Sequence, residues 1–491
     1  GTISVELYNN TLSASVSGTE VTLNVSDLSF CTVSGDQGGW ILFKFASVLL
    51  LAGNAYNVRA KTSDASQVNL FRDGTANNWS RLLRTTTNQA PVAGDDMYIF
   101  GEHTGAGTGN NISVTMDNTA VTDFGSASTS LATPAISISK RGTLQVGVAV
   151  STNYYLRISG NFIVYSQGTL NIGTVGTPIP SSSSAVLEFD CAVNVDFGLT
   201  ILADGNFTSQ GAVKTIVKTL LNADASAAAT VITLVSTAGW SANDELGFAS
   251  TTRTASQSEK KTVSTIDSGT QVTLTAGLTN AHSGTSPTQA EVINLTRNVK
   301  IRGMSATLQS YVDIKNQAII DIDYTEFYWL GSATANKRGI TIATIGVGSF
   351  NCQFSSLYDF VVASSQGLNI SSASGSTITF SNNVTYNIHS EHLTNVATSG
   401  IQTFDSNVFI LNVTSAGWMV AFGDNGITFT NNTVVSGADS NRGGITFQEA
   451  ITDIGTFSGN TAHSNAGSGI NITSSGGSST YGIGGTISST T

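Results

Sequence analysis

The motif Thr-Phe-x-x-Asn occurs four times near the C-terminal end of the chain, starting at Thr379, Thr403, Thr428 and Thr456. Successive copies begin 24, 25 and 28 residues apart. A fixed period of this length marks an array of similar units, because one unit cannot bury its apolar face alone and must stack on its neighbours. The spacing predicts that each copy belongs to one coil of a parallel β-helix.

Each residue type of the motif suits one place in such a coil. Side chains alternate along a strand, so Thr and Phe face opposite ways, and the phenylalanines of successive coils are expected to stack inside. Asn tolerates turn geometry, and its amide can hydrogen-bond the Asn one coil away. The alternative is chance recurrence, because the pair Thr446/Phe447 falls outside the period. The four asparagines are Asn383, Asn407, Asn432 and Asn460.

The period begins well before these four copies. Arg-Gly-Thr-Leu-Gln-Val-Gly at 141–147 is echoed 26 residues later by Gln-Gly-Thr-Leu-Asn-Ile-Gly at 167–173. Ser-Gly-Asn-Phe at 159–162 and Asp-Gly-Asn-Phe at 204–207 form a second echo. The stretch 213–258 interrupts the pattern, and we expect a lateral insertion there.

Three segments follow from these patterns. Residues 1–94 show no coil period but alternating stretches between Gly, Asn and Ser turns, which predicts a small N-terminal β-sandwich. Residues 95–303 and 304–491 are predicted to form an all-β parallel β-helix of 24–28 residues per coil. At ~25 residues per coil and a rise of ~4.8 Å, the β-helix would hold about fifteen coils over a length on the order of 70 Å.

The composition limits the class of partner. Only 11% of the 491 residues are charged, the net charge is −11, and no basic stripe is visible, which argues against a nucleic-acid partner. The longest apolar stretch, 40–52, contains Lys44 and is shorter than the ~18 residues that a membrane helix needs. No membrane span is therefore expected, and a weakly charged surface rich in Thr, Ser and Asn suits a surface appendage.

One block of the second segment resembles part of a known domain. It comprises Trp240, residues 244–251, 257–259 and 272–274, His282, and residues 290–303, with Leu-Thr-Arg-Asn-Val at 295–299 as its most specific piece. These residues resemble the end of the G-eight glycine-rich domain of fibrocystin and of the cell-migration-inducing hyaluronidase family. With the upstream echoes, the resemblance covers about 95–303. It implies a right-handed, pectin-lyase-like parallel β-helix on an extracellular protein in contact with glycans. It implies no catalytic residue, because the family's His-Phe-His pattern has no counterpart here.

Two carboxylates form the candidate catalytic site. Asp321 and Asp323 alternate with isoleucines, so a strand would point both to the same outer face, ~7 Å apart. This separation lies near the lower end of the range for inverting glycosidases, in which an acid and a base flank a water molecule. The pair would also suit a cation. The alternative interpretation is a solvated polar edge beside an isoleucine core.

Other candidate residues are weaker. Trp79 beside Arg81 could stack on a sugar ring, although Trp79 also fits an ordinary core. His389 and His392 would face opposite ways on a strand, which favours a surface loop over a metal site. The turns at 423–426 and 439–441 offer oxygen ligands of the kind that calcium uses, but neither has the full loop spacing. We expect no metal or other cofactor, with calcium at these turns as the alternative.

The favoured function is structural or adhesive. Such a protein would be a phage fibre, spike or decoration protein, or a subunit of a microbial surface filament, located outside the cell on a virion or a cell surface. Its partners would be copies of itself, other structural subunits and a cell-surface glycan. A polysaccharide-degrading enzyme using Asp321 and Asp323 and a carbohydrate-binding module centred on Trp79 are the alternatives. The sequence does not decide whether the protein is an enzyme, and a protein without catalytic activity is favoured.

Overall fold

The computed structural model describes a nearly continuous C-terminal part and separate segments before it. The described residues are 2–9, 14–15, 21–24, 56–62, 82–84, 97–100, 112–116, 121–128, 134–139, 142–147, 152–315, 317–345, 348–373, 375–395, 400–412, 420–422, 427–437, 444–448, 455–467 and 469–473. Trp79, Arg81 and the two candidate calcium turns lie outside these residues.

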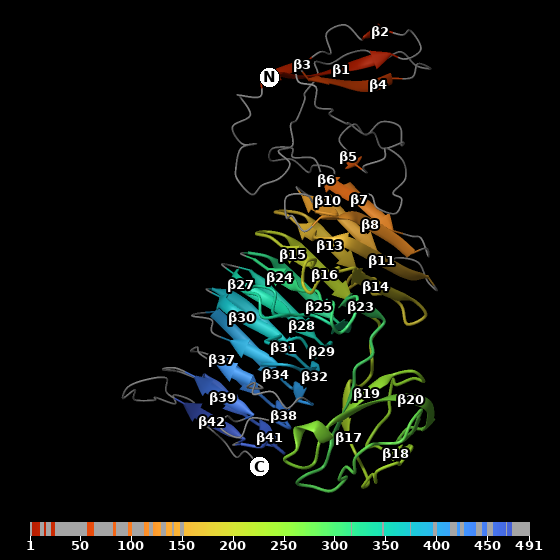
Figure 1. Ribbon diagram of the computed structural model, residues 1–491, viewed down its shortest axis with the longest axis vertical. Coiled ribbons are helices and arrows are strands. Elements are labelled where there is room, and N and C mark those ends of the chain that lie inside the picture. Colours follow the sequence, from red (N-terminus) through yellow and green to blue (C-terminus); the bar gives the residue numbers. More distant parts are fainter. Residues whose placement is uncertain are drawn as a thin grey trace.

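Three parallel sheets form the sides of a β-helix, and each coil adds one strand to each sheet in turn (Figure 1). Sheet I contains β7 (Ile112–Met116), β10 (Gly142–Val146), β13 (Thr169–Ile172), β16 (Asn206–Gln210), β25 (Ile319–Asp323), β28 (Ser349–Gln353), β31 (Ser376–Ser381), β34 (Gly400–Asp405), β37 (Ile427–Thr430) and β40 (Thr456–Ser458). Sheet II contains β8 (Val121–Ser128), β11 (Asn153–Gly160), β14 (Ser184–Phe189), β23 (Val299–Gly303), β26 (Thr325–Tyr328), β29 (Ser356–Phe360), β32 (Val384–Ile388), β35 (Val408–Ile410), β38 (Thr433–Val435) and β41 (Thr461–His463).

Sheet III closes the coil and begins with a capping strand. It contains β6 (Met97–Phe100), β9 (Ile136–Ser139), β12 (Phe162–Val164), β15 (Leu199–Ile201), β24 (Val312–Ile314), β27 (Ile340–Ile345), β30 (Leu368–Ala373), β33 (Leu393–Asn395), β36 (Val420–Phe422), β39 (Ile445–Gln448) and β42 (Ile470–Thr473). Strand β5 (Leu82–Arg84) pairs antiparallel with β6. It therefore covers the edge that sheet III would otherwise expose at the first coil.

The structure confirms the parallel β-helix and corrects its length. The chain forms about 10 turns of ~28 residues per turn. At a rise of ~4.8 Å per coil, this is a shaft of about 48 Å. The prediction of about fifteen coils is wrong, because a long segment after β16 leaves the helix and adds no coil.

The N-terminal strands form a separate antiparallel sheet. Strand β1 (Thr2–Asn9) pairs with β2 (Ala14–Ser15), β3 (Val21–Asn24) and β4 (Tyr56–Thr62), which makes four strands. One layer of the predicted sandwich is thus present among the described residues, and a second layer is not among them. The sandwich and the predicted boundaries at 94 and 303 stay predictions.

The Thr-Phe-x-x-Asn copies stack in register, one above the other. Phe380 pairs with Phe404, Phe404 with Phe429, and Phe429 with Phe457 in adjacent strands of sheet I. The last two rings are stacked, with centroids 5.7 Å apart and planes at 13°. Cys352 occupies the same position one coil earlier. The predicted aromatic column inside the helix is confirmed.

The asparagines of the motif form a buried ladder at the corner between sheets I and II. The side-chain oxygen of Asn432 accepts the backbone N–H of Asn407 at 2.9 Å, and its amide donates to the Phe404 carbonyl at 2.9 Å. The same contacts repeat along the ladder. The left-handed residue at the bend is the one before each Asn, such as Asn431 with φ 55°. The asparagine itself points inward and supplies the hydrogen bonds.

The two echoes have different outcomes. Thr143 pairs with Thr169 in adjacent strands of sheet I, so the first echo is the coil period. Phe162 lies on sheet III and Phe207 on sheet I, so the second echo does not mark equivalent positions. Thr446 lies on β39 of sheet III, which explains why its pair with Phe447 falls outside the period.

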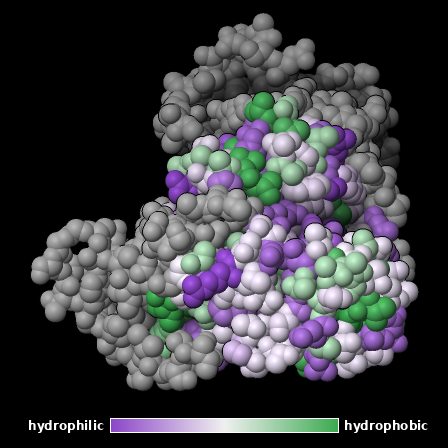
Figure 2. Space-filling view, turned by 60° about the horizontal axis from the view of Figure 1, so that its bottom comes forward, coloured by the Kyte–Doolittle hydropathy of each residue, from purple (hydrophilic) through white to green (hydrophobic). Residues whose placement is uncertain are grey.

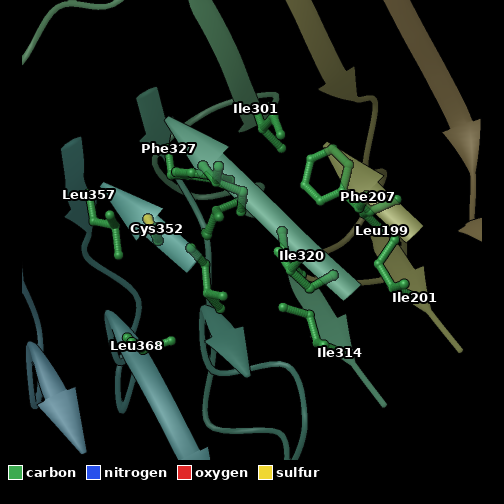
Figure 3. Close-up of a cluster of buried hydrophobic side chains, with 14 of the residues drawn as sticks. Leu199, Ile201, Phe207, Ile301, Ile314, Ile320, Phe327, Cys352, Leu357 and Leu368 are labelled. Carbon is green, nitrogen blue, oxygen red and sulfur yellow. The ribbon is translucent and has the colours of Figure 1, made fainter. Parts of the chain in front are cut away.

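The core fills the space between the three sheets. Figure 3 shows apolar side chains from all three converging there, with Phe207 and Ile320 from sheet I, Ile301 and Phe327 from sheet II, and Ile314 from sheet III. All five side chains are buried. Residues that alternate with them therefore face outward, which is where any functional group must be sought.

The lateral insertion is an antiparallel sheet that extends beyond the predicted range of 213–258. Its order is β17 (Lys218–Leu220), β22 (Glu291–Asn294), β19 (Glu245–Phe248), β20 (Glu259–Ser268), β21 (Gln271–Leu274) and β18 (Val231–Thr233), with the short helix η3 (Ala255–Gln257) before β20. It has its own hydrophobic core, which includes Trp240, Leu246 and Phe248.

The insertion packs against the outer face of sheet II, beside the C-terminal half of the shaft (Figure 1). Val217 and Ile293 of the insertion join Tyr386 and Ile410 of sheet II in one buried apolar cluster. Near the last described coil, His463 contacts Glu291 of the insertion at 2.9 Å. This face of the lower coils is therefore covered by the chain itself.

Candidate functional site

The candidate carboxylates lie on the outer face of sheet I. Along β25, Ile320 and Ile322 are buried while Asp321 and Asp323 are half-buried between them. The amide of Asn351, one coil further, donates to Asp321 Oδ1 at 2.8 Å. The predicted orientation of the two aspartates is thus confirmed, while their role stays a prediction.

The two carboxylates differ in their electrostatic surroundings. Burial raises the pKa of Asp323 to about 6, and the negative charge of Asp321 adds to that rise. The Oδ1 atom of Asp323 is buried without a hydrogen-bond partner among the described residues. A carboxyl group that holds its proton near pH 6 beside a second carboxyl group is the arrangement that separates an acid from a base.

The raised pKa of Asp323 predicts a pH-dependent gain in stability from Asp323→Asn. The folded-state pKa of about 6 lies above the ordinary aspartate pKa of 3.8, so the folded state binds the extra proton and stability falls as pH rises between these values. Asn carries no charge, and at pH 7.5 we expect about 1 kcal/mol of added stability, after discounting the shift for half-exposure. Melting temperatures at pH 7.5 and pH 3.5 measure it. An equal gain at both values would contradict the electrostatic origin.

Two aromatic residues border this carboxylate pair. Tyr324 and Phe354 occupy the corner between sheets I and II with φ of 50° and 51°. Their rings stack with centroids 4.9 Å apart and planes at 7°. Bulky residues rarely adopt left-handed backbone, so the corner holds both rings at some cost in strain. The result is a half-buried aromatic step beside Asp323.

A second polar and aromatic group lies on the outer face of sheet II and at the corner that follows β26, and we call it the Trp329 cluster. It consists of Arg157, Glu188, Arg302, Tyr328 and Trp329. The Arg302 guanidinium lies 5.5 Å from the centre of each of the two rings. The Tyr328 and Trp329 rings meet edge to face, with centroids 4.8 Å apart. Both rings are half-buried, so each keeps a part of its surface in solvent.

The coil register assembles this cluster from distant parts of the sequence. Arg157 pairs with Glu188, Glu188 with Arg302, and Arg302 with Tyr328 in adjacent strands of sheet II. The insertion falls between Glu188 and Arg302, so no short motif marks the group. Aligning the sequences of successive coils after removing the insertion would have placed Glu188, Arg302 and Tyr328 at equivalent positions and so revealed the cluster.

The Leu-Thr-Arg-Asn-Val block closes the junction where the insertion returns to the shaft. The Asn298 side chain accepts the Ala212 N–H at 2.8 Å and donates to the carbonyls of Ile179, Pro180 and Ser183 at 2.9–3.0 Å. These contacts tie the outgoing and returning chains to the preceding coil. The most specific piece of the G-eight resemblance therefore has a structural role here.

The histidine motif at 389–392 lies partly in the core. His392 is fully buried, which corrects its predicted place on a surface loop, and burial lowers its pKa to about 3, so it stays neutral. Across the described residues, no group of three or more His, Cys, Asp or Glu side chains could hold a metal ion. In the same residues, no helix is long and apolar enough to cross a membrane.

Comparisons with known proteins find likeness only among solved structures. No family model and no curated protein matches the chain, so the likeness to the G-eight domain rests on the residues quoted above. Three phage tailspikes are similar. Gp49 of Pseudomonas phage LKA1 is 14% identical with a TM-score of 0.18, covering 65% of this chain and 52% of its own. Gp54 of Acinetobacter baumannii bacteriophage AP22, solved in complex with A. baumannii capsular saccharide, is 12% identical with a TM-score of 0.18, covering 70% and 60%. Gp61 of Pseudomonas phage phi297 is 11% identical with a TM-score of 0.21, covering 65% and 55%.

These values are low, and the chain spans only 52–60% of the length of these tailspikes. The chain is a parallel β-solenoid with a likeness to phage tailspikes. The fold itself rests on the strand ladders described above, and the likeness assigns no function to any residue.

Proposed function

We propose that this chain is an extracellular structural or adhesive protein whose β-helical shaft binds a glycan through the Trp329 cluster. This proposal rests on the position of the Arg302 guanidinium, 5.5 Å from the ring centres of Tyr328 and Trp329 on an outward face. Aromatic rings pack against the C–H faces of sugars, and guanidinium and carboxylate groups hydrogen-bond sugar hydroxyls. A few polar groups around an apolar surface are typical of such sites.

The face of the molecule toward its C-terminal end suits weak, polar contacts. In the view toward the C-terminal end, the described residues are mostly white or purple, and the green patches are small and separate (Figure 2). Only 11% of the residues are charged. Binding is therefore expected at a local cluster and not across a broad apolar face.

Trp329→Ala is expected to weaken retention on a glycan by at least tenfold, because aromatic anchors that the ligand covers carry most of the affinity at such sites. Retention on immobilised host-surface polysaccharide measures it. The matched control is Thr403→Ala on the outer face of sheet I, which we expect to leave retention unchanged. Equal retention by Trp329→Ala and the parent protein would contradict the proposal, provided that both have the same melting temperature.

A second candidate function is polysaccharide hydrolysis at Asp321 and Asp323. It is favoured by their common outward face on β25 and by the raised pKa of Asp323, which would make it the proton donor and Asp321 the base. Asp321→Asn and Asp323→Asn should each abolish depolymerisation if this is the activity. A parent protein that shortens no polysaccharide removes this candidate.

We also infer that the protein resides on a virion or a cell surface and associates with its own copies or other subunits. The supporting features are a coil stack of about 10 turns and the low fraction of charged residues, 11%. A right-handed coil is expected, because parallel crossovers are right-handed in nearly all folds. Electron microscopy of the native preparation tests the location: regular incorporation into a particle or filament is expected, whereas free single shafts would contradict it.

A further inference from the structure

The cationic side chains of the Trp329 cluster and of the strand positions beside it are paired with carboxylates among the described residues. Arg302 contacts Glu188 at 2.5 Å, and Arg157 contacts Asp190 at 2.7 Å. Lys300, the next cation on this face, contacts Glu326 at 3.0 Å. Three cationic side chains thus face three carboxylates. A ligand that reaches the cluster meets aromatic rings and ion pairs, and no excess of either charge.

An anionic sugar would have to displace one of these carboxylates. The Glu188 side chain is only 7% exposed and lies within ion-pair distance of both arginines, at 3.7 Å from Arg157. Losing its arginine partners would leave a mostly buried charge unpaired, which is strongly unfavourable. The net charge of −11 adds a long-range repulsion of polyanions. An uncharged sugar meets neither penalty.

We infer that the Trp329 cluster binds uncharged sugar residues and discriminates against uronates, sialic acids and sulfated sugars. This inference rests on the proposed glycan-binding function and names its ligand class. Trp329 and Tyr328 would contact the apolar face of the sugar ring. The ion-paired guanidinium and carboxylate groups would exchange hydrogen bonds with its hydroxyls while they keep one another in place.

The test compares neutral and acidic glycans on the full chain. The neutral probes are laminarin, dextran, galactan and a panel of neutral oligosaccharides; the acidic probes are polygalacturonate, hyaluronan and polysialic acid. We expect retention on a neutral probe at least tenfold above every acidic probe, with little change between low and high salt. Trp329→Ala should remove that retention.

The matched variant Glu188→Gln keeps the shape of the side chain and removes the negative charge that pairs with Arg157 and Arg302. We expect it to narrow the preference for neutral over acidic probes at least threefold. The comparison of probes on the parent protein stands by itself if this variant fails to fold. An unchanged preference in a folded Glu188→Gln protein would overturn the charge argument.

The remaining outcomes separate the two proposals. Retention on acidic probes that is lost in Trp329→Ala would overturn the neutral-sugar inference and leave the glycan-binding proposal standing. Retention that Trp329→Ala does not change would overturn both, because the site would lie elsewhere. No retention on any probe would also overturn both.

Discussion

Replacing Glu326 by alanine is expected to destabilise the protein by about 3–5 kcal/mol, because it removes the carboxylate beside a buried arginine. Arg297 is among the largest fully buried side chains, and Glu326 is only 1% exposed. Burial lowers the pKa of Arg297 to about 10, so the guanidinium stays charged at neutral pH. The carboxylate of Glu326 opposes this shift through its charge.

Glu326 also satisfies several donors around the junction of shaft and insertion. It accepts the backbone N–H of Arg297 at 2.7 Å and the hydroxyl of Tyr358 at 2.6 Å. The Arg297 guanidinium itself donates to the carbonyls of Asn294 and Phe354 at 2.9 and 2.7 Å. Glu326→Ala therefore leaves two buried donors without their acceptor, and it removes the nearby negative charge that partly offsets the buried Arg297 guanidinium.

Two further variants separate the charge from the hydrogen bonds. Glu326→Gln keeps an acceptor and removes the charge, and it should lose less stability than Glu326→Ala. Arg297→Met removes the buried charge together with its desolvation penalty, and it should also lose less. Urea unfolding followed by tryptophan fluorescence measures the series, since Trp240 lies in the insertion core and Trp329 on the shaft. A loss below about 1 kcal/mol in Glu326→Ala would contradict the assigned role.

The coil was predictable because its physics is local and repeated. Phe380 and Asn383 recur at equivalent positions of four coils, and each copy has the same neighbours above and below. The same reasoning predicted that Asp321 and Asp323 share a face, since alternation along a strand needs no knowledge of distant residues. Local rules therefore fixed the fold class and the direction of side chains.

The extent of the insertion and the Trp329 cluster were not predictable by the same route. The antiparallel strands from β17 to β22 have no coil period, so the sequence shows where the period stops but not where it resumes. The place of Arg302 beside Glu188 depends on that point. His392 was misplaced because a polar residue can enter the core when its ring is neutral and bonded, here to Thr385. Strand pairing across a long insertion and the inward orientation of polar side chains can be determined only from the assembled coils.

Asn432→Ala is expected to destabilise the C-terminal coils by about 3 kcal/mol, because the ladder loses several buried hydrogen bonds at one step. The substitution strips the acceptor from the backbone N–H and from the side-chain amide of Asn407, both at 2.9 Å, and the donor from the Phe404 carbonyl. All of these groups lie inside the coil, where water cannot replace the lost partner. Amide hydrogen exchange at Asn407 and the urea midpoint measure the effect.

The matched control is the neighbouring Asn431→Gly. Asn431 is exposed and has φ 55°, a conformation that Gly adopts without strain, so we expect its stability to stay within about 0.5 kcal/mol of the parent. The two variants alter adjacent residues of one corner, and only one of them reaches the buried ladder. If both variants lost stability equally, the corner as a whole would matter and not the ladder. Faster exchange at Asn407 in Asn432→Ala alone would show that the amide ladder holds successive coils in register.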